Sequence, residues 1–252
     1  MKTKKHDAII LSSEPEKAAN ALLAQSLKGS PLPEDEIIHN LGLYVTSKTL
    51  SRILFFYEIY RLILPIHGSI MEFGVRWGQT LSLMIALRGI FEPFNRHRQI
   101  IGFDTFKGFR GVTEKDGNKS QCADGSFSVA PDYPHYLEDI LTTQEALNPM
   151  AHLRRFELRK GDALKTVPQY FREHPESVVA LAVLDFDIYA PTKAALEAVR
   201  PHLCKGSVLV FDELSDPYFP GETLAVQEVL GLRNISVRRY PMTARVSYAV
   251  VE

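Results

Sequence analysis

Cysteine is almost absent from the sequence. Cys122 and Cys204 are the only two in 252 residues, and they lie far apart in the chain. A disulfide-stapled secreted scaffold needs several cysteines, and a cysteine-based zinc site needs closely spaced ones. The sequence therefore excludes both classes, and we expect two ordinary thiols.

The sequence also lacks an excess of one charge and a long hydrophobic run. The 29 Lys and Arg nearly balance the 30 Asp and Glu, for a formal net charge of −1, so the basic excess typical of nucleic-acid or anionic-membrane binding is missing. The most apolar segment, residues 50–64, contains Arg52, Glu58 and Arg61 and is shorter than the roughly 20 apolar residues that span a bilayer. The basic start MKTKKHD is not followed by an apolar stretch of signal-peptide length. We therefore expect a cytoplasmic protein with no nucleic-acid and no membrane partner.

The remaining composition, 45% hydrophobic and 23% charged, is typical of a folded globular protein. From residue 68 onward, short apolar runs alternate with helical patterns. The expected strands are residues 69–75, 99–103, 155–158, 178–184, 207–211, 236–240 and 246–251, and the expected helices are residues 80–90, 164–173, 192–199 and 224–232. This alternation predicts an α/β fold in which helices cover a seven-stranded, mostly parallel sheet with an antiparallel edge strand.

Two segments lie outside this alternation. Residues 1–67 predict an N-terminal helical extension that covers the core, with Thr46 or Ser47 as the cap of its last helix. Residues 68–252 predict the main domain. Within it, residues of about 107–152 are rich in glycine and proline around one expected helix, and a loop this long in a compact domain is usually functional. We expect this segment to be a lid insertion over the open end of the sheet.

A glycine-containing turn follows the first expected strand. Residues 72–80 read EFGVRWGQT, in which Gly74 and Gly78 let the chain turn tightly into a helix and let a ligand approach the backbone. Arg76 stands where the dinucleotide fingerprint G-x-G-x-x-G needs a glycine. This difference argues against a nicotinamide-dependent oxidoreductase.

Acidic residues follow the second and third expected strands. Asp104 can accept hydrogen bonds from both ribose hydroxyls of an adenosine-containing ligand, and Asp162 can contact an exocyclic amine. Each aspartate can equally cap the helix that follows it, which is the commoner use. Together with the glycine turn, the two aspartates favour a crevice shaped for a nucleoside.

Four carboxylates follow the fourth and fifth expected strands, and they are Asp185, Asp187, Asp212 and Glu213. If the two strands are neighbours, these groups gather at one end of the sheet and raise one another's pKa unless a cation lies among them. Oxygen ligands without histidine or cysteine favour Mg²⁺, with Ca²⁺ as the second choice. The alternative is that the acids cap the following helices, which applies most to Asp187.

The order and spacing of these motifs resemble the macrocin O-methyltransferase (TylF-type) family of class I S-adenosylmethionine-dependent sugar O-methyltransferases. The matching motifs are Val45-Thr46-Ser47, Phe73-Gly74-Val75, Asp104-Thr105-Phe106-Lys107-Gly108, Asp185-x-Asp187-x-Tyr189 and Asp212-Glu213. The resemblance covers roughly residues 40–251. It implies a Rossmann-like methyltransferase fold and a metal-assisted transfer of a methyl group to a sugar hydroxyl of a glycosylated natural product, as in antibiotic biosynthesis.

The resemblance also implies a cofactor site, whose residues are Ser47, Glu72, Gly74, Gly78, Asp104, Asp162 and Ala163. The glycine turn with Glu72 would hold the methionine part of S-adenosylmethionine, and Ser47 at a helix N-terminus would take its carboxylate. Asp104 would bind the ribose. The pair Asp162 and Ala163 would bind the adenine.

For the reaction itself, the resemblance implies that Asp185, Asp212 and Glu213 hold Mg²⁺ and that Asp187 is the general base. His135 in the insertion is a rival base. The family typically has two aspartates where this chain has Asp212 and Glu213, so the glutamate is a departure that bears on the metal geometry.

Three further expectations concern alternatives and partners. A catechol or other small-phenol O-methyltransferase stays open on the same scaffold, although Ile188 stands near the position where catechol enzymes have a lysine. A non-catalytic cofactor-binding protein of the same fold is the alternative outside enzymes. The expected partners are a glycosylated small-molecule acceptor and further copies of this chain in a homo-oligomer.

Overall fold

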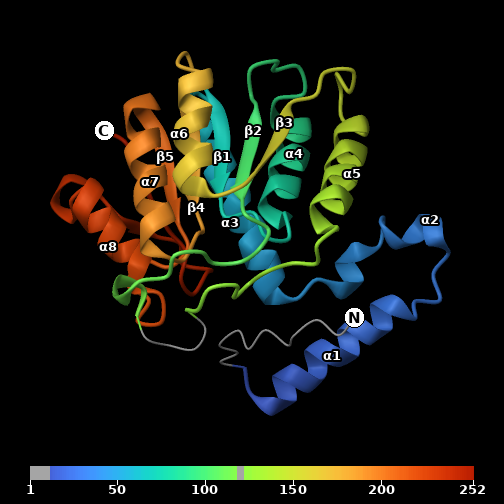
Figure 1. The fold of residues 1–252 in the computed structure, drawn as a ribbon. Helices are drawn as coiled ribbons and strands as arrows, with labels where there is room; N and C mark the ends of the chain where they lie inside the picture. Colours follow the sequence, from blue (N-terminus) through green and yellow to red (C-terminus); the bar gives the residue numbers. More distant parts are fainter. Residues whose placement is uncertain (1–11, 118–121) are drawn as a thin grey trace.

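The fold is built on a seven-stranded sheet with the strand order β3-β2-β1-β4-β5-β7-β6 (Figure 1). It is seen in a computed structural model that describes residues 12–117 and 122–252. The strands are β1 (Ser69–Phe73), β2 (Ile100–Asp104), β3 (Phe156–Lys160), β4 (Val179–Leu184), β5 (Leu203–Phe211), β6 (Arg238–Arg239) and β7 (Ser247–Val250). β1 to β5 run parallel, and β7 is antiparallel to β5 and β6. The predicted Rossmann-like fold with an antiparallel edge is confirmed.

Helices cover both faces of the sheet (Figure 1). One layer consists of α3 (Ser47–Ile63), α4 (Gln79–Phe91) and α5 (Tyr133–Ala146), and the other of α6 (Ala163–Glu173), α7 (Tyr189–Val199) and α8 (Pro220–Val229). Successive strand residues point to opposite faces, so Ile70 belongs to one hydrophobic cluster and Met71 to the other. All six residues of β4 are buried, as expected for a strand covered on both faces.

The N-terminal segment contributes only α3 to these layers. Before it come α1 (Glu14–Lys28), α2 (Glu34–Ile37) and the short 3₁₀ helix η1 (Leu41–Tyr44). α1 begins with a reciprocal cap between Ser13 and Glu16, yet none of its residues is buried. Thr46 caps α3 by accepting a hydrogen bond from the Thr49 amide. The division at residue 67 and the homo-oligomer stay predictions, and the start MKTKKHD lies outside the described residues.

The insertion between β2 and β3 divides into two parts. α5 joins the helical layer beside α4, while the part before it, with the 3₁₀ helix η2 (Glu114–Asp116), packs at the carboxyl ends of the strands. Phe109 and Cys122 of this part bury themselves against Ile188 and Phe219. Residues 118–121 of the expected lid lie outside the described residues. Through Phe109 and Cys122, the insertion makes a small hydrophobic contact with the main domain.

Buried ion pairs fix the opposite end of the sheet. Arg88 near the end of α4 and Arg155 just before β3 both pair with Glu145 of α5, and all three side chains are buried. Arg98 pairs with Glu92 in the same region. In the part of the chain that the structure describes, no helix is both long and apolar enough to cross a membrane.

Candidate active site

The register of the strands brings the predicted site residues together at the carboxyl end of the sheet. Leu184, the last residue of β4, pairs with Phe73 of β1 on one side and with Phe211 of β5 on the other. Asp185 and Asp212 follow these paired residues directly and so emerge side by side. The two strands that carry the acidic residues, β4 and β5, are therefore neighbours, as the sequence analysis required.

Gly74 lets the β1 turn lie against the end of β4. Its φ angle is 109°, and a Cβ atom at this position would lie 1.9 Å from the carbonyl oxygen of Asp185. No residue other than glycine fits such an approach. The glycine turn after β1 and the acidic end of β4 are therefore in direct backbone contact. Gly78, with φ of 74°, begins α4, where a Cβ would meet the side chain of Leu137.

Glu72 is the most unusual group on the cofactor side. Its side chain is 2% exposed, and its Oε2 atom has no hydrogen-bond partner among the described residues. Burial raises the pKa of Glu72 to about 8. A buried carboxylate with one unpartnered oxygen fits a bound ammonium group, which would supply both a positive charge and a hydrogen bond.

Two other predicted cofactor residues, Asp104 and Asp162, take part in local turns. The carboxylate of Asp104 accepts hydrogen bonds from the amides of Arg76 at 2.7 Å and Phe106 at 2.5 Å, which fixes it at the end of β2. Asp162 caps α6 by accepting a bond from the Leu164 amide at 3.0 Å. The capping role that the sequence left open is thus the one Asp162 has here, and its contact with a ligand stays a prediction.

Three carboxylates converge beyond the strand ends. Asp185, Asp187 and Glu213 each offer an oxygen within 4.8 Å of the others. The Oε2 atom of Glu213 is buried and has no hydrogen-bond partner among the residues that the structure describes. Burial raises the pKa of Asp187 to about 6, and it also raises the pKa values of Asp185 and Glu213. Oxygen-only donors with an unsatisfied buried oxygen fit a hard divalent cation such as Mg²⁺.

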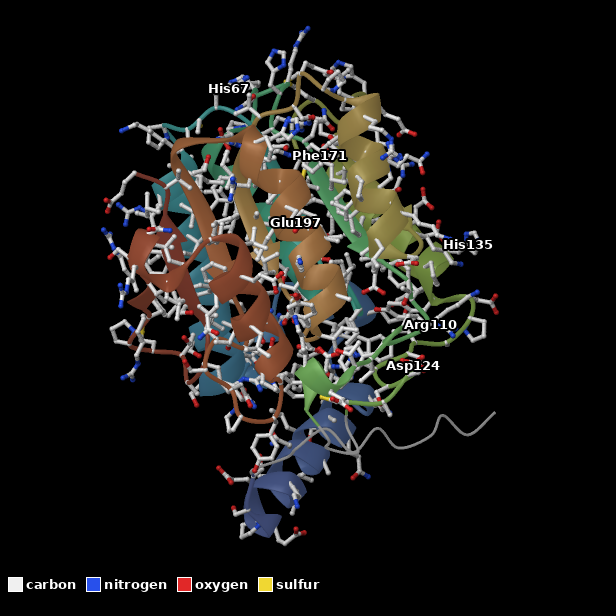
Figure 2. All side chains as sticks on the ribbon, turned by 60° about the vertical axis from the view of Figure 1, so that its left-hand side comes forward. His67, Arg110, Asp124, His135, Phe171 and Glu197 are labelled. Carbon is white, nitrogen blue, oxygen red and sulfur yellow. The ribbon has the colours of Figure 1, made fainter. Side chains whose placement is uncertain are left out.

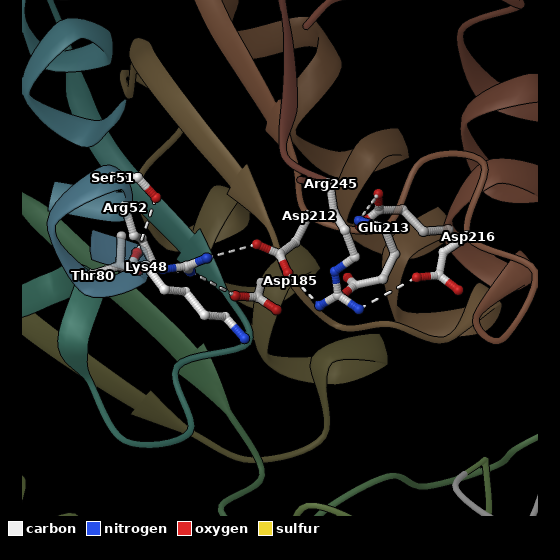
Figure 3. Close-up of polar contacts among 10 residues, drawn as sticks. Lys48, Ser51, Arg52, Thr80, Asp185, Asp212, Glu213, Asp216 and Arg245 are labelled. Carbon is white, nitrogen blue, oxygen red and sulfur yellow. Dashed lines mark hydrogen bonds and ion pairs between the residues drawn. The ribbon is translucent and has the colours of Figure 1, made fainter. Parts of the chain in front are cut away.

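Asp212 is held between two arginines, as Figure 3 shows. Arg52 of α3 donates from Nη1 to Oδ1 of Asp212 at 2.8 Å and lies 3.4 Å from Oδ2 of Asp185. Arg245 lies 3.4 Å from Oδ2 of Asp212 and 3.0 Å from Oε1 of Glu213. Burial alone would raise the pKa of Asp212, but Arg52 and Arg245 outweigh it, so the pKa is lowered.

The predicted metal set therefore appears in a different arrangement. Asp187 stands with Asp185 and Glu213, whereas both oxygens of Asp212 face guanidinium groups. The ligand roles of these residues stay predictions.

Arg52 and Arg245 were not predicted as site residues. The signal for Arg52 in the sequence was a charge within a mostly apolar segment, which served there only to exclude a membrane span. Glu222 was also missed: it is fully buried on α8, and its Oε1 accepts the Glu213 amide at 3.0 Å. These groups define the shape of the acidic cluster.

The remaining predicted residues lie at the margins. Ser47 is exposed as the first residue of α3, and Ala163 is buried as the first residue of α6. His135 is exposed near the start of α5, and Figure 2 shows it at the outer surface. His135 is not among the groups that shift the pKa of Asp187 most strongly.

Comparison with known proteins gives close structural matches. No protein-family model and no curated protein sequence matches the chain. The chain is 39% identical to CalS11, a calicheamicin methyltransferase, with 99% of this chain and 98% of that one covered and a TM-score of 0.93. A second CalS11 structure, the apo form of a TDP-rhamnose 3'-O-methyltransferase in calicheamicin biosynthesis, is 38% identical, covers 96% of each chain and has a TM-score of 0.85. The O-methyltransferase NovP shares the fold at 16% identity, with 93% and 98% covered and a TM-score of 0.60.

Proposed function

The chain belongs to the class I S-adenosylmethionine-dependent sugar O-methyltransferases that include CalS11, and from this we propose that it methylates a sugar hydroxyl of a glycosylated small molecule with the help of Mg²⁺. The observation that supports the metal is the convergence of Asp185, Asp187 and Glu213 beside the glycine turn. The relation to CalS11 makes TDP-rhamnose the first acceptor to test and antibiotic biosynthesis the expected setting.

The cofactor is held by groups at the ends of β1 and β2. Glu72 receives the ammonium group of S-adenosylmethionine, and Asp104, already fixed by two backbone amides, keeps free lone pairs for the ribose hydroxyls. Because Gly74 brings this turn against Asp185, a cofactor bound by Glu72 and Asp104 would present its methyl group next to the acidic cluster. Holding both reactants in line is a large part of the rate enhancement in a displacement reaction.

The acidic cluster handles the acceptor. A sugar hydroxyl is a weak nucleophile, and a bound Mg²⁺ supplies Lewis acidity that lowers the pKa of such a hydroxyl. Asp185 and Glu213 would hold the ion, and Asp212, whose two oxygens face Arg52 and Arg245, is the third proposed ligand. Asp187, whose pKa of about 6 suits a base near neutral pH, accepts the hydroxyl proton as the methyl group is transferred.

The proposal is tested by calorimetric titration with S-adenosylhomocysteine and by an assay for a mass gain of one methyl group. The acceptor panel contains TDP-rhamnose, glycosides with an intact aglycone, and catechol, each with Mg²⁺ or with a chelator. We expect S-adenosylhomocysteine to bind, a sugar acceptor to be methylated and the chelator to abolish turnover. Methylation of catechol alone would favour a small-phenol O-methyltransferase. Equal turnover with Mg²⁺ and with the chelator would exclude a role for the metal.

The pH dependence of cofactor binding follows from Glu72. At pH 7 its carboxyl is largely protonated, because burial raises its pKa to about 8. The ligand's ammonium stabilises the ionised form, so binding at pH 7 releases a proton, and affinity increases as the pH rises toward 8. Calorimetry in two buffers of different ionisation enthalpy measures this proton, and Glu72→Gln is expected to abolish it. An equal proton release from the variant would contradict the assignment.

A further inference from the structure

Asp116 is a buried carboxylate in the insertion that the proposed reaction does not use. It ends η2, and its side chain is 1% exposed. Its Oδ2 accepts hydrogen bonds from the amide of Thr113 at 2.7 Å and from the hydroxyl of Thr113 at 3.0 Å. Its Oδ1 accepts a hydrogen bond from the backbone amide of Tyr189, which lies 73 positions further along the chain.

This long-range bond replaces a missing helix cap. Tyr189 is the first residue of α7, where backbone amides have no partner within the helix. The N-cap residue, Ile188, has no side chain that can accept such a bond. Asp116 therefore supplies from the insertion what a local Ser, Thr or Asp usually supplies, and its negative charge also suits the positive end of the helix.

The junction around this bond is tightly packed. A Cβ atom on Gly221 of α8 would lie 2.3 Å from Oδ1 of Asp116 and 2.5 Å from the Tyr189 nitrogen. Ile188 is buried in the cluster that includes Phe109. The insertion, α7 and α8 thus meet with no space for an independent shift of the turn.

Asp187 lies within this turn, two residues before Tyr189. Its φ angle is 62°, in the left-handed region that residues other than glycine adopt only when their surroundings enforce it. Two further bonds hold the turn: the Ile188 amide donates to the Phe186 carbonyl at 2.7 Å, and the Thr192 hydroxyl donates to the Ile188 carbonyl at 2.7 Å. A contact that anchors the start of α7 therefore also sets where the Asp187 carboxylate points.

We propose that Asp116 is a positioning residue, which holds the turn between β4 and α7 so that Asp187 faces Asp185 and Glu213. The inference rests on the role of Asp187 in the proposed function. Asp116 connects the insertion to the turn that carries Asp187, because it accepts hydrogen bonds from Thr113 in the insertion and from Tyr189 at the start of α7.

The test compares Asp116→Ala with the wild-type chain in three measurements. We expect kcat to fall about tenfold or more, because the base moves away from the acceptor. Mn²⁺ affinity, measured by electron paramagnetic resonance, is expected to fall as well, because the negative charge of Asp187 moves away from Asp185 and Glu213. S-adenosylhomocysteine affinity is expected to stay within about twofold, since Asp116 touches no cofactor group. Asp124→Ala is the matched control: Asp124, labelled in Figure 2, bonds the Val112 amide at 3.1 Å within the same insertion, and its loss is expected to leave kcat unchanged.

A second variant covers poor folding of the alanine protein. Asp116→Asn keeps an oxygen for the Tyr189 amide but loses an acceptor for Thr113, so its kcat and Mn²⁺ affinity are expected between those of the wild type and Asp116→Ala. Wild-type kcat and Mn²⁺ affinity in a folded variant, with only a lower melting temperature, would overturn the proposal. Asp187→Asn in the same assays separates the two ideas. If it retains turnover, the role of Asp187 fails, and if it loses turnover while the Asp116 variants do not, only the positioning role fails.

Discussion

Asp187→Asn is expected to lower turnover by about a hundredfold or more, which is within the usual contribution of a general base. The amide cannot accept a proton, and it has one carbonyl oxygen in place of two carboxylate oxygens. Asparagine tolerates the left-handed φ of 62° at this position, so the turn is expected to keep its shape. Steady-state kcat with a sugar acceptor is the measurement.

Two comparisons make this result specific to the base. S-adenosylhomocysteine affinity of Asp187→Asn is expected to equal that of the wild type, because the cofactor groups lie on β1 and β2. Asp124→Asn, an equal change in charge within the insertion, is expected to have wild-type kcat. Wild-type turnover of Asp187→Asn would exclude Asp187 as the base.

Glu145→Gln is expected to destabilise the fold by about 3–5 kcal/mol, the usual effect of breaking a buried ion pair from one side. Glu145 is the shared partner of Arg88 and Arg155, and the glutamine leaves both buried guanidinium groups without a counter-charge. Their remaining bonds are to backbone oxygens, including those from Arg88 to the carbonyls of Arg98 at 3.0 Å and Arg155 at 2.7 Å. Urea unfolding followed by circular dichroism gives the free energy of unfolding.

The same helix provides the control for this stability prediction. Glu138 of α5 pairs with Arg154 at 2.6 Å, but the two side chains are 41% and 55% exposed. Exposed pairs contribute about 0–1 kcal/mol, so Glu138→Gln is expected to unfold almost like the wild type. If the two glutamine variants had equal unfolding free energies, the buried network would have no special importance for stability.

The core elements were predictable because their patterns are local. The run at residues 178–184 is apolar throughout and forms β4, and the expected helix at 164–173 differs from α6 by one residue. α1 was not predicted with bounds of its own, although the Ser13 and Glu16 pair at its start is a capping-box signature; the helix buries no residue. The expected strand at 236–240 shortens to two exposed residues, Arg238 and Arg239, at the edge of the sheet.

The acidic strand ends were also predictable, since parallel neighbours place their carboxyl ends together. Their partners were not. Arg52 reaches Asp212 across 160 positions and Asp185 across 133, and the spacing rules of helices and strands act over only a few residues. The exchange of Asp212 for Asp187 in the converging set likewise depends on these distant arginines.

The backbone contact between Gly74 and Asp185 limits how such an enzyme can be re-engineered. The backbone of Gly74 lies directly against that of Asp185, so no side chain of residue 74 separates the glycine turn from the acidic residues after β4. On the proposed assignment, any side chain added at Gly74 would separate the cofactor residues on β1 from the acidic residues after β4. Libraries aimed at new selectivity should therefore leave this glycine untouched and diversify the surrounding loops.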